Sequence, residues 1–176
     1  MNIQSVLTEI AVLACGGIIT IAIAYTIVKN DVRQYFKPNT ANEKNQIKLQ
    51  LLPLRLQAHE RLVVFIERIN PANLFLRLHQ SGISLTELQS AVLNEIRSEY
   101  QHNVAQQLYV NSETWGVISK LKDDTLAMIN NAVRSLPEDA LGVDLSRKVL
   151  QHMAGMERNP YDLTLGMIKK DIHKLF

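Results

Sequence analysis

The chain has 176 residues, of which 47% are hydrophobic, and a formal net charge of +2. A chain of this length accommodates one domain of ordinary size and little more. The weak net charge, without clustered bases or interleaved aromatic residues, argues against a nucleic-acid-binding surface. The single cysteine, Cys15, excludes an intramolecular disulfide and a metal site built from several cysteines.

An uncharged apolar run near the N-terminus is the most distinctive segment of the sequence. Residues 10–28 are 19 consecutive positions without a charged side chain. As a helix, the run is about 28 Å long, close to the ~30 Å hydrocarbon thickness of a bilayer. A buried core helix would need partners on every side, and a cleaved signal peptide would begin with bases, which residues 1–9 lack. We therefore predict a transmembrane helix at residues 10–28, preceded by a short external N-terminus at residues 1–9.

The flanking charges predict how this helix is oriented. All 19 Lys and Arg residues follow the apolar run, whereas residues 1–9 carry only the acidic Glu9. Because bases are enriched on the cytoplasmic side, we expect the N-terminus outside and residues 29–176 inside. The predicted localisation is a bacterial inner membrane, with a single pass and a cytoplasmic C-terminal domain.

Small residues recur every four positions within the apolar run, at Gly16, Thr20 and Ala24. Such a stripe lets transmembrane helices approach closely and is a candidate surface for lateral packing. It is equally consistent with the ordinary small-residue content of such helices, so the sequence leaves both interpretations open.

A polar segment separates the apolar run from the rest of the chain. Residues 37–45 show no apolar periodicity, so we predict a juxtamembrane segment and linker at residues 29–45. From Gln46 onward, apolar residues recur every three or four positions, as in amphipathic helices. The first helix is expected to extend to Ile69, with Pro53 kinking or starting it. Asn70-Pro71 then stops this helix and starts a short one that ends near Gly82.

Local start signals predict the remaining helices. Ser84 and Glu87 have the spacing of a capping box, and the helix that they open should extend to about residue 107. A second long helix is expected from Ser112 until Pro137 closes it. Two weaker helices follow, at residues 145–153 and from about residue 161, the latter capped by Asn159.

The predicted fold is all-α: one N-terminal transmembrane helix and a cytoplasmic bundle of four to six helices at residues 46–176. The sequence shows no alternating strand pattern and no repeat. Trp115 heads an apolar stripe and should be largely buried. At the C-terminal end, four apolar residues share one helical face, Ile168, Ile172, Leu175 and Phe176. We expect this face to dock onto the bundle in preference to a membrane surface, because a small domain needs the apolar area for its core.

Two blocks of sequence resemble a family of uncharacterised Bacteroidota proteins. The first begins Gln57-Ala58-His59-Glu60-Arg61-Leu62 and continues through Asn70-Pro71 to Arg77-Leu78-His79. The second begins Leu93-Asn94-Glu95-Ile96-Arg97 and continues to Tyr109-Val110. The resemblance covers the anchor and most of the domain. It implies a single-span membrane protein with a domain of unknown function, and it implies no activity.

Glu95, Glu99 and His102 are the candidate metal ligands. Their spacing places all three on one face of a helix, and Glu99-x-x-His102 is the step that carboxylate-bridged di-iron bundles use. The chain has no second Glu-x-x-His, and His59, Glu60 or His79 could complete a mononuclear site only through tertiary contacts. A solvated, ion-paired helix face is the competing interpretation.

The sequence contains no catalytic signature and predicts no cofactor. The glycines of the domain form no phosphate-binding loop, and no serine lies in a nucleophile elbow. Two hypotheses follow. The first is a membrane-anchored helical adaptor or accessory subunit, whose partners are the bilayer and a protein or a second copy, with no nucleic acid or small molecule indicated. The alternative is a metal-binding or enzymatic helical bundle that uses the Glu95, Glu99 and His102 face.

Overall fold

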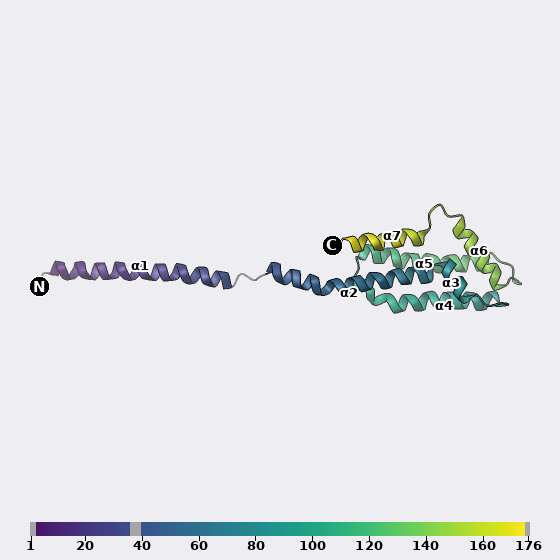
Figure 1. Cartoon of the computed structure of the whole chain (residues 1–176), viewed down its shortest axis with the longest axis horizontal. Coiled ribbons are helices and arrows are strands. Elements are labelled where there is room, and N and C mark those ends of the chain that lie inside the picture. The colour runs from purple at the N-terminus through teal and green to yellow at the C-terminus, as the bar shows by residue number, and fades with distance from the viewer. Residues whose placement is uncertain (1–2, 36–39, 175–176) are drawn as a thin grey trace. The chain divides into compact units, whose positions relative to one another are not determined.

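The computed structural model describes the backbone of residues 3–35 and 40–174, and the side-chain surroundings of residues 13–29 and 46–174. Over these residues the chain forms seven α-helices, one short 3-10 helix and no strand, which confirms the prediction of an all-α fold. The chain divides into two compact units, Met1–Lys48 and Leu49–Phe176 (Figure 1).

Helix α1, Ile3–Tyr35, makes up most of the first unit. Its described side chains, from Leu13 to Lys29, are all exposed. Among the residues that the structure describes, no helix combines the length and the apolarity needed to cross a membrane. The predicted span at residues 10–28 is thus not supported by the described residues, and positions 10–12 lie outside the described side chains.

Helix α2, Thr40–Ile69, supplies one wall of the core of the second unit. Its fully buried apolar residues lie three or four positions apart on one side of the helix: Ala58, Leu62, Ile66 and Ile69. Residues 40–45, which the sequence places in a polar linker, are helical. Pro53 lies inside α2 and does not start it, so the carbonyl of Leu49 lacks its usual helical donor.

The predicted caps of the next two helices are confirmed. The side chain of Asn70 accepts a hydrogen bond from the N–H of Ala72 at 3.2 Å and starts α3, Pro71–Leu78. At the start of α4, Leu85–Asn103, the N–H of Glu87 donates to Ser84 Oγ at 3.2 Å. The N–H of Ser84 donates in return to Glu87 Oε2 at 3.1 Å. This is the expected capping box. The Ser84 hydroxyl also donates to Glu87 Oε2 at 2.7 Å, and this bond, with the one from the N–H of Ser84, lowers the pKa of Glu87.

A 3-10 helix, Val104–Leu108, follows α4 and leads into three further α-helices. These are α5, Ser112–Arg134; α6, Gly142–Ala154; and α7, Pro160–His173. Helix α5 begins at Ser112, as predicted, and its cap is Asn111, whose side chain accepts from the N–H of Glu113 at 2.9 Å. The cap of α7 is Asn159, as predicted.

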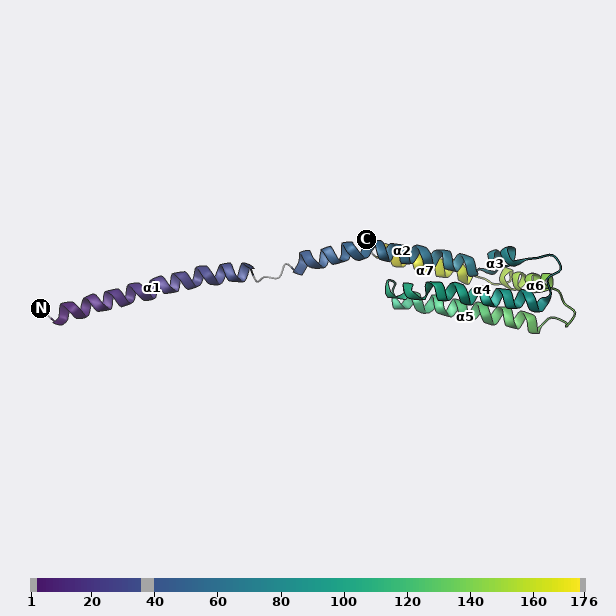
Figure 2. The same cartoon turned by 90° about the horizontal axis from the view of Figure 1, so that it is seen from below.

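The four long helices of the second unit, α2, α4, α5 and α7, lie lengthwise beside one another, and the two views agree on this arrangement (Figures 1 and 2). Helices α3 and α6 lie at the end of the bundle where α4 begins. The six helices α2–α7 match the expected bundle of four to six helices.

The turns that precede α4 and α6 pair with each other. Ser84 and Leu141 form an isolated antiparallel bridge, and the N–H of Gly142 donates to the carbonyl of Ile83 at 3.0 Å. A Cβ added at Gly142 would lie 2.7 Å from Ile83 Cγ2 and 3.0 Å from Leu88 Cδ2. The chains approach so closely here that only glycine fits without displacement.

These two helix starts also resemble each other in sequence. Ser84-Leu85-Thr86-Glu87-Leu88 and Leu141-Gly142-Val143-Asp144-Leu145 align from the bridged pair, with an acidic residue at the same position. Each acidic side chain accepts the N–H three residues earlier, at 3.1 Å in the first and 3.0 Å in the second. The two helix starts therefore use the same contact between an acidic side chain and the N–H three residues earlier.

The core of the second unit is one apolar cluster, to which all six helices contribute side chains. Tyr100 lies between Phe65 and Trp115, with ring centroids 6.2 Å and 5.5 Å away. Trp115 is partly buried: it packs against the cluster and stacks on Tyr100. This placement agrees with the prediction that Trp115 is largely buried.

Helix α7 docks onto the bundle as predicted. Ile168 is fully buried, and Ile172 packs against the core cluster. Lys169, Lys170 and Lys174 are exposed. Leu175 and Phe176, which belong to the same predicted face, lie outside the described residues.

Candidate functional site

Helix α4 places the predicted metal ligands Glu95, Glu99 and His102 along one side, but the two carboxylates bind arginines. Arg68 Nε lies 2.7 Å from Glu99 Oε1, and Arg68 Nη2 lies 3.1 Å from Glu95 Oε1. Arg77 Nη2 reaches the same Glu95 oxygen at 3.0 Å. The arginines come from α2 and α3, so this cluster joins three helices across the surface of the bundle.

His102 does not converge with these carboxylates on a common point. Its Nδ1 lies 2.8 Å from the carbonyl of Ser98, one turn earlier on the same helix. Of the proposed additional ligands, His59 is fully buried elsewhere and His79 is exposed at the end of α3. Within the described part of the chain, no group of three or more His, Cys, Asp or Glu residues is arranged to hold a metal ion.

A buried ion pair, which sequence reasoning missed, joins α2 to α7. His59 is 0% exposed, and its Nε2 lies 3.3 Å from Oδ2 of Asp171. His59 Nδ1 lies 2.6 Å from the carbonyl of Arg55, an acceptor only. Both ring nitrogens of His59 therefore face an oxygen atom that can accept a hydrogen bond.

Asp171 also holds the start of α5. Its Oδ2 accepts the N–H of Asn111 at 3.0 Å. Burial pushes the pKa of Asp171 up, but the hydrogen bonds from Asn111 and His59 and the positive charges of His59 and Lys174 outweigh it, so the pKa is lowered. The pair thus fastens α2, α5 and α7 at one point. Since His59 has no exposed surface, it cannot act on a substrate in solution.

A second buried polar contact lies between α5 and α7. Thr125 Oγ1 donates to the carbonyl of Leu121 at 2.7 Å and lies 2.6 Å from the hydroxyl of Tyr161, which therefore is the donor of that second bond. Burial raises the pKa of Tyr161 to about 12. Both hydroxyls are satisfied internally, so this contact is structural and offers no free proton donor.

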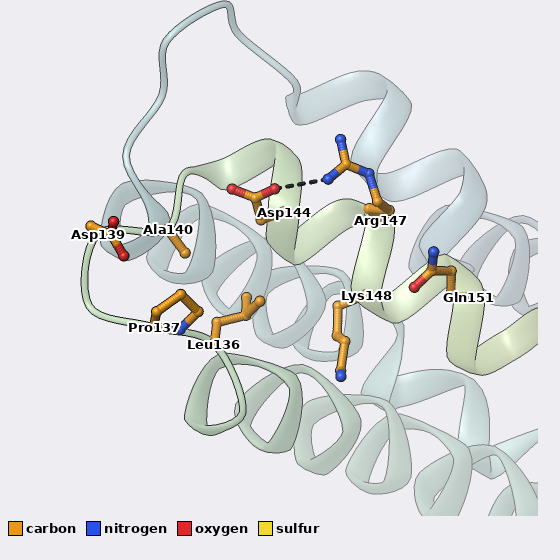
Figure 3. A pocket seen from close by; sticks show the side chains of 8 residues that line it. All are labelled: Leu136, Pro137, Asp139, Ala140, Asp144, Arg147, Lys148 and Gln151. Carbon is orange, nitrogen blue, oxygen red and sulfur yellow. Dashed lines mark hydrogen bonds and ion pairs between the residues drawn. The ribbon is translucent and has the colours of Figure 1, made fainter.

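A surface cavity of about 380 Å³ lies between the turn after α5 and the outer face of α6 (Figure 3). Leu136 and Pro137 line one side of it, and Asp144, Arg147 and Lys148 the other. Asp144 Oδ1 and Arg147 Nη1 pair at 2.9 Å. The side chain of Lys148 extends away from Arg147 (Figure 3), and it forms no ion pair with any described residue.

The small residues of the predicted packing stripe lie on α1. Gly16, Thr20 and Ala24 are exposed. The hydroxyl of Thr20 donates back to the helix, with the carbonyls of Gly16 and Gly17 at 3.1 Å and 2.9 Å. The stripe therefore presents no free hydroxyl hydrogen, and its role in helix association stays a prediction.

Comparison with known proteins identifies a family without an assigned activity. No curated protein and no solved structure matches the chain significantly. One family matches residues 5–175, and it is described as a family of unknown function (DUF7935). The predicted resemblance to an uncharacterised family is thereby confirmed at that level, while the Bacteroidota origin and the single span stay predictions. The chain belongs to the DUF7935 family.

Proposed function

We propose that this protein is a membrane-tethered interaction module, in which α1 attaches the chain to a bacterial inner membrane. The observation that carries the proposal is the uncovered apolar surface of α1, where Ile18 and Ile21 are 67% and 70% exposed. An exposed apolar helix surface is stabilised where apolar surroundings cover it. The 19 uncharged residues at positions 10–28 match the thickness of a bilayer.

The helical unit of α2–α7 is the part that binds protein in this proposal, as an adaptor or accessory subunit. Two leucines on its surface are largely exposed to solvent: Leu76 on α3 is 82% exposed and Leu108 in the 3-10 helix is 78% exposed. Single exposed apolar residues are common, so each is a contact candidate to be tested singly. A partner protein or a second copy of the chain would cover them.

The alternative, a metal-binding or enzymatic bundle, is less favoured by the geometry. Glu95 and Glu99 already bind Arg68 and Arg77. A metal at this face would have to displace both arginines, and the arginines would then lose their counter-charges.

Topology is tested with fusions placed after Phe176 in living bacteria. A reporter that fluoresces only in the cytoplasm should be bright, and alkaline phosphatase, which is active only in the periplasm, should be silent. Active phosphatase would contradict the proposed orientation. Elemental analysis of the purified full chain tests the alternative, because stoichiometric iron, manganese or zinc would favour the metal-binding bundle.

Partner binding is tested by site-specific photocrosslinking in the same cells. A photoreactive residue at position 76 or 108 should give a discrete crosslinked product, and one at the exposed polar position 90 on α4 should not. Leu76→Ser and Leu108→Ser should reduce the product without changing the fold. Equal amounts of crosslinked product at all three positions would indicate non-specific crosslinking and would contradict the proposed contacts at Leu76 and Leu108.

A further inference from the structure

Helix α3 carries Leu76, one of the two proposed contacts, and is too short to be stable without its neighbours. It has eight residues, of which Pro71, Leu74 and Phe75 are buried. A helix of this length is marginal in water, because its few backbone hydrogen bonds do not offset the cost of nucleation. The position of Leu76 therefore depends on the contacts that hold α3 against the rest of the bundle.

The buried residues of α3 are supplemented by polar contacts on another side of the helix. Asn73 Nδ2 donates to the carbonyl of Glu67 on α2 at 3.0 Å and to Glu67 Oε2 at 3.1 Å. Arg77 Nη2 donates to the carbonyl of Arg68 on α2 at 3.3 Å and to Glu95 Oε1 on α4 at 3.0 Å. Asn73 and Arg77 are four residues apart, so they lie on the same side of α3. This side joins α3 to both α2 and α4.

Arg77 connects α3 to the charge cluster of Arg68, Glu95 and Glu99. Among the described residues, it is the only member of α3 that forms an ion pair. Arg68 binds the same Glu95 oxygen at 3.1 Å and Glu99 at 2.7 Å. Loss of the Arg77 side chain would therefore weaken the hold on α3, while Arg68 keeps α2 joined to α4. A network of charges contributes more than one exposed pair, and salt screens it.

Leu76 directly precedes Arg77 and lies about 100° away from it around the helix. Its side chain is 82% exposed, so the backbone of α3, and not packing of the leucine, sets its position. We infer that Arg77 is a positioning residue for the contact at Leu76, and that its ion pair with Glu95 makes this contact sensitive to ionic strength. The role at the contact rests on the proposed function, whereas the hold of Arg77 on α3 is a property of the chain by itself.

Leu108 provides a comparison within the same chain. It is 78% exposed and lies in the 3-10 helix Val104–Leu108, which contains no charged residue. No ion pair therefore holds this short helix through its own side chains. A contact at Leu108 should not respond to changes at Arg77.

Hydrogen exchange tests the hold on α3 in the full chain, placed in phosphatidylcholine nanodiscs and followed by mass spectrometry of peptides covering residues 71–79. Arg77→Ala should speed exchange there about threefold, because α3 opens more often. Arg77→Lys keeps the charge and should exchange more slowly than Arg77→Ala. The control is Arg97→Ala, which removes an exposed arginine of α4 that forms no ion pair with a described residue and should leave exchange in α3 unchanged.

Salt gives a second measurement of the same contact. Raising sodium chloride from about 0.1 M to about 1 M shortens the Debye length from about 10 Å to about 3 Å. Exchange in α3 should become faster in the unchanged chain and change little in Arg77→Ala. The inference is overturned if Arg77→Ala exchanges α3 no faster than Arg97→Ala, or if both chains respond equally to salt. Unchanged exchange in α5 shows that a variant keeps its fold.

Photocrosslinking in cells tests the role of Arg77 at the contact. Arg77→Ala should lower the product at position 76 about threefold and leave the product at position 108 unchanged, and Arg77→Lys should restore part of the loss. Equal product at position 76 with and without the Arg77 side chain would overturn the positioning role. If the unchanged chain gives no product at position 76, the proposed contact itself is contradicted, and the exchange measurement still decides whether Arg77 holds α3.

Discussion

The two compact units use the same kinds of apolar residue in opposite ways. In α1, Ile18 and Ile21 are 67% and 70% exposed, whereas in α2 Leu62 and Ile66 are 0% exposed. Full burial of such a side chain contributes about 1.5–3 kcal/mol. The second unit obtains this stabilisation from its own helices. In the first unit, similar side chains are not buried by any described residue. Whether an apolar helix side chain is buried therefore depends on the available packing partners and not on composition alone.

The largest expected effect is on the self-contained unit. Asp171→Ala removes the partner of His59 and the acceptor for the N–H of Asn111, and leaves the buried His59 ring without its contact on α7. We expect a loss of about 3–5 kcal/mol in the free energy of unfolding. The measurement is urea unfolding of the full chain followed by the fluorescence of Trp115, the sole tryptophan, which reports on this unit alone. Lys169→Ala, at an exposed position of α7, should change stability by no more than about 0.5 kcal/mol. If Asp171→Ala changes the free energy of unfolding by an equally small amount, the pair of His59 and Asp171 does not stabilise the unit.

The matching change in the first unit is Ile21→Arg. If α1 is covered by hydrocarbon, a charge at its centre costs about 2.5–3.5 kcal/mol of insertion free energy. The fraction of chain in the membrane should fall, and Ile21→Leu should not change it. Full membrane association of the Arg variant would mean that α1 is covered by something other than lipid.

Gly142→Ala tests how tightly the second unit closes on itself. The added methyl group would lie 2.7 Å from Ile83 Cγ2 and 3.0 Å from the carbonyl oxygen of Ile83. We expect a loss of about 1–3 kcal/mol, as for other overpacked sites. The control is Gly155→Ala at the end of α6, where the closest contact would be 3.6 Å. Equal effects of the two changes on urea unfolding would contradict a close approach at Gly142.

Acidification should weaken the second unit through Asp171. Its pKa is lowered from the ordinary value of 3.8, so the folded chain binds this proton less tightly than the unfolded chain. The contribution of the carboxylate is complete above that ordinary value and is lost as the pH falls through the lowered pKa. Unfolding measured from about pH 6 to about pH 2 should show a steeper acid loss than the same series for Asp171→Asn. If stability falls with pH equally in the unchanged chain and in Asp171→Asn, Asp171 is not the cause of the acid loss.

The smallest expected effect is at the exposed pair of Lys120 and Asp124 on α5. Lys120 Nζ lies 2.8 Å from Asp124 Oδ2, but the two side chains are 73% and 60% exposed. Lys120→Ala should cost about 0.3–0.5 kcal/mol, and less at high salt. A loss above about 1 kcal/mol in the same unfolding assay would mean that surface ion pairs rival the buried one in this unit.

Signals confined to a few neighbouring residues were predictable from the sequence. Ser84 and Glu87 specify a capping box through a spacing of three residues. Asn70 and Asn159 cap α3 and α7 by accepting a hydrogen bond from the N–H two residues later. The start of α2 was predicted too late, because residues 40–45 are polar and lack apolar periodicity although they are helical. The start of α5 was predicted at Ser112, where the helix begins, and Asn111 caps it.

Features that depend on distant residues were not predictable. His59 and Asp171 are 112 positions apart in the chain, and no local pattern relates them. The fate of Glu95 and Glu99 depends on Arg68 and Arg77, which other helices bring to the same surface. Gly142 has no sequence feature that shows how near Ile83 lies. One signal was present for the buried pair: His59 lies directly beside Ala58 on the apolar side of α2, where an unpaired polar side chain would be costly.

The most direct test of the account is whether residues 1–35 alone determine attachment to the membrane. Membranes from bacteria that express the full chain are washed with alkaline carbonate, which releases proteins bound only at the surface, and compared with membranes from cells expressing the chain without residues 1–35. The account predicts that the full chain stays in the membrane pellet and that the shortened chain is recovered in solution with the same Trp115 unfolding transition. Release of the full chain by carbonate, or retention of the shortened one, would contradict it.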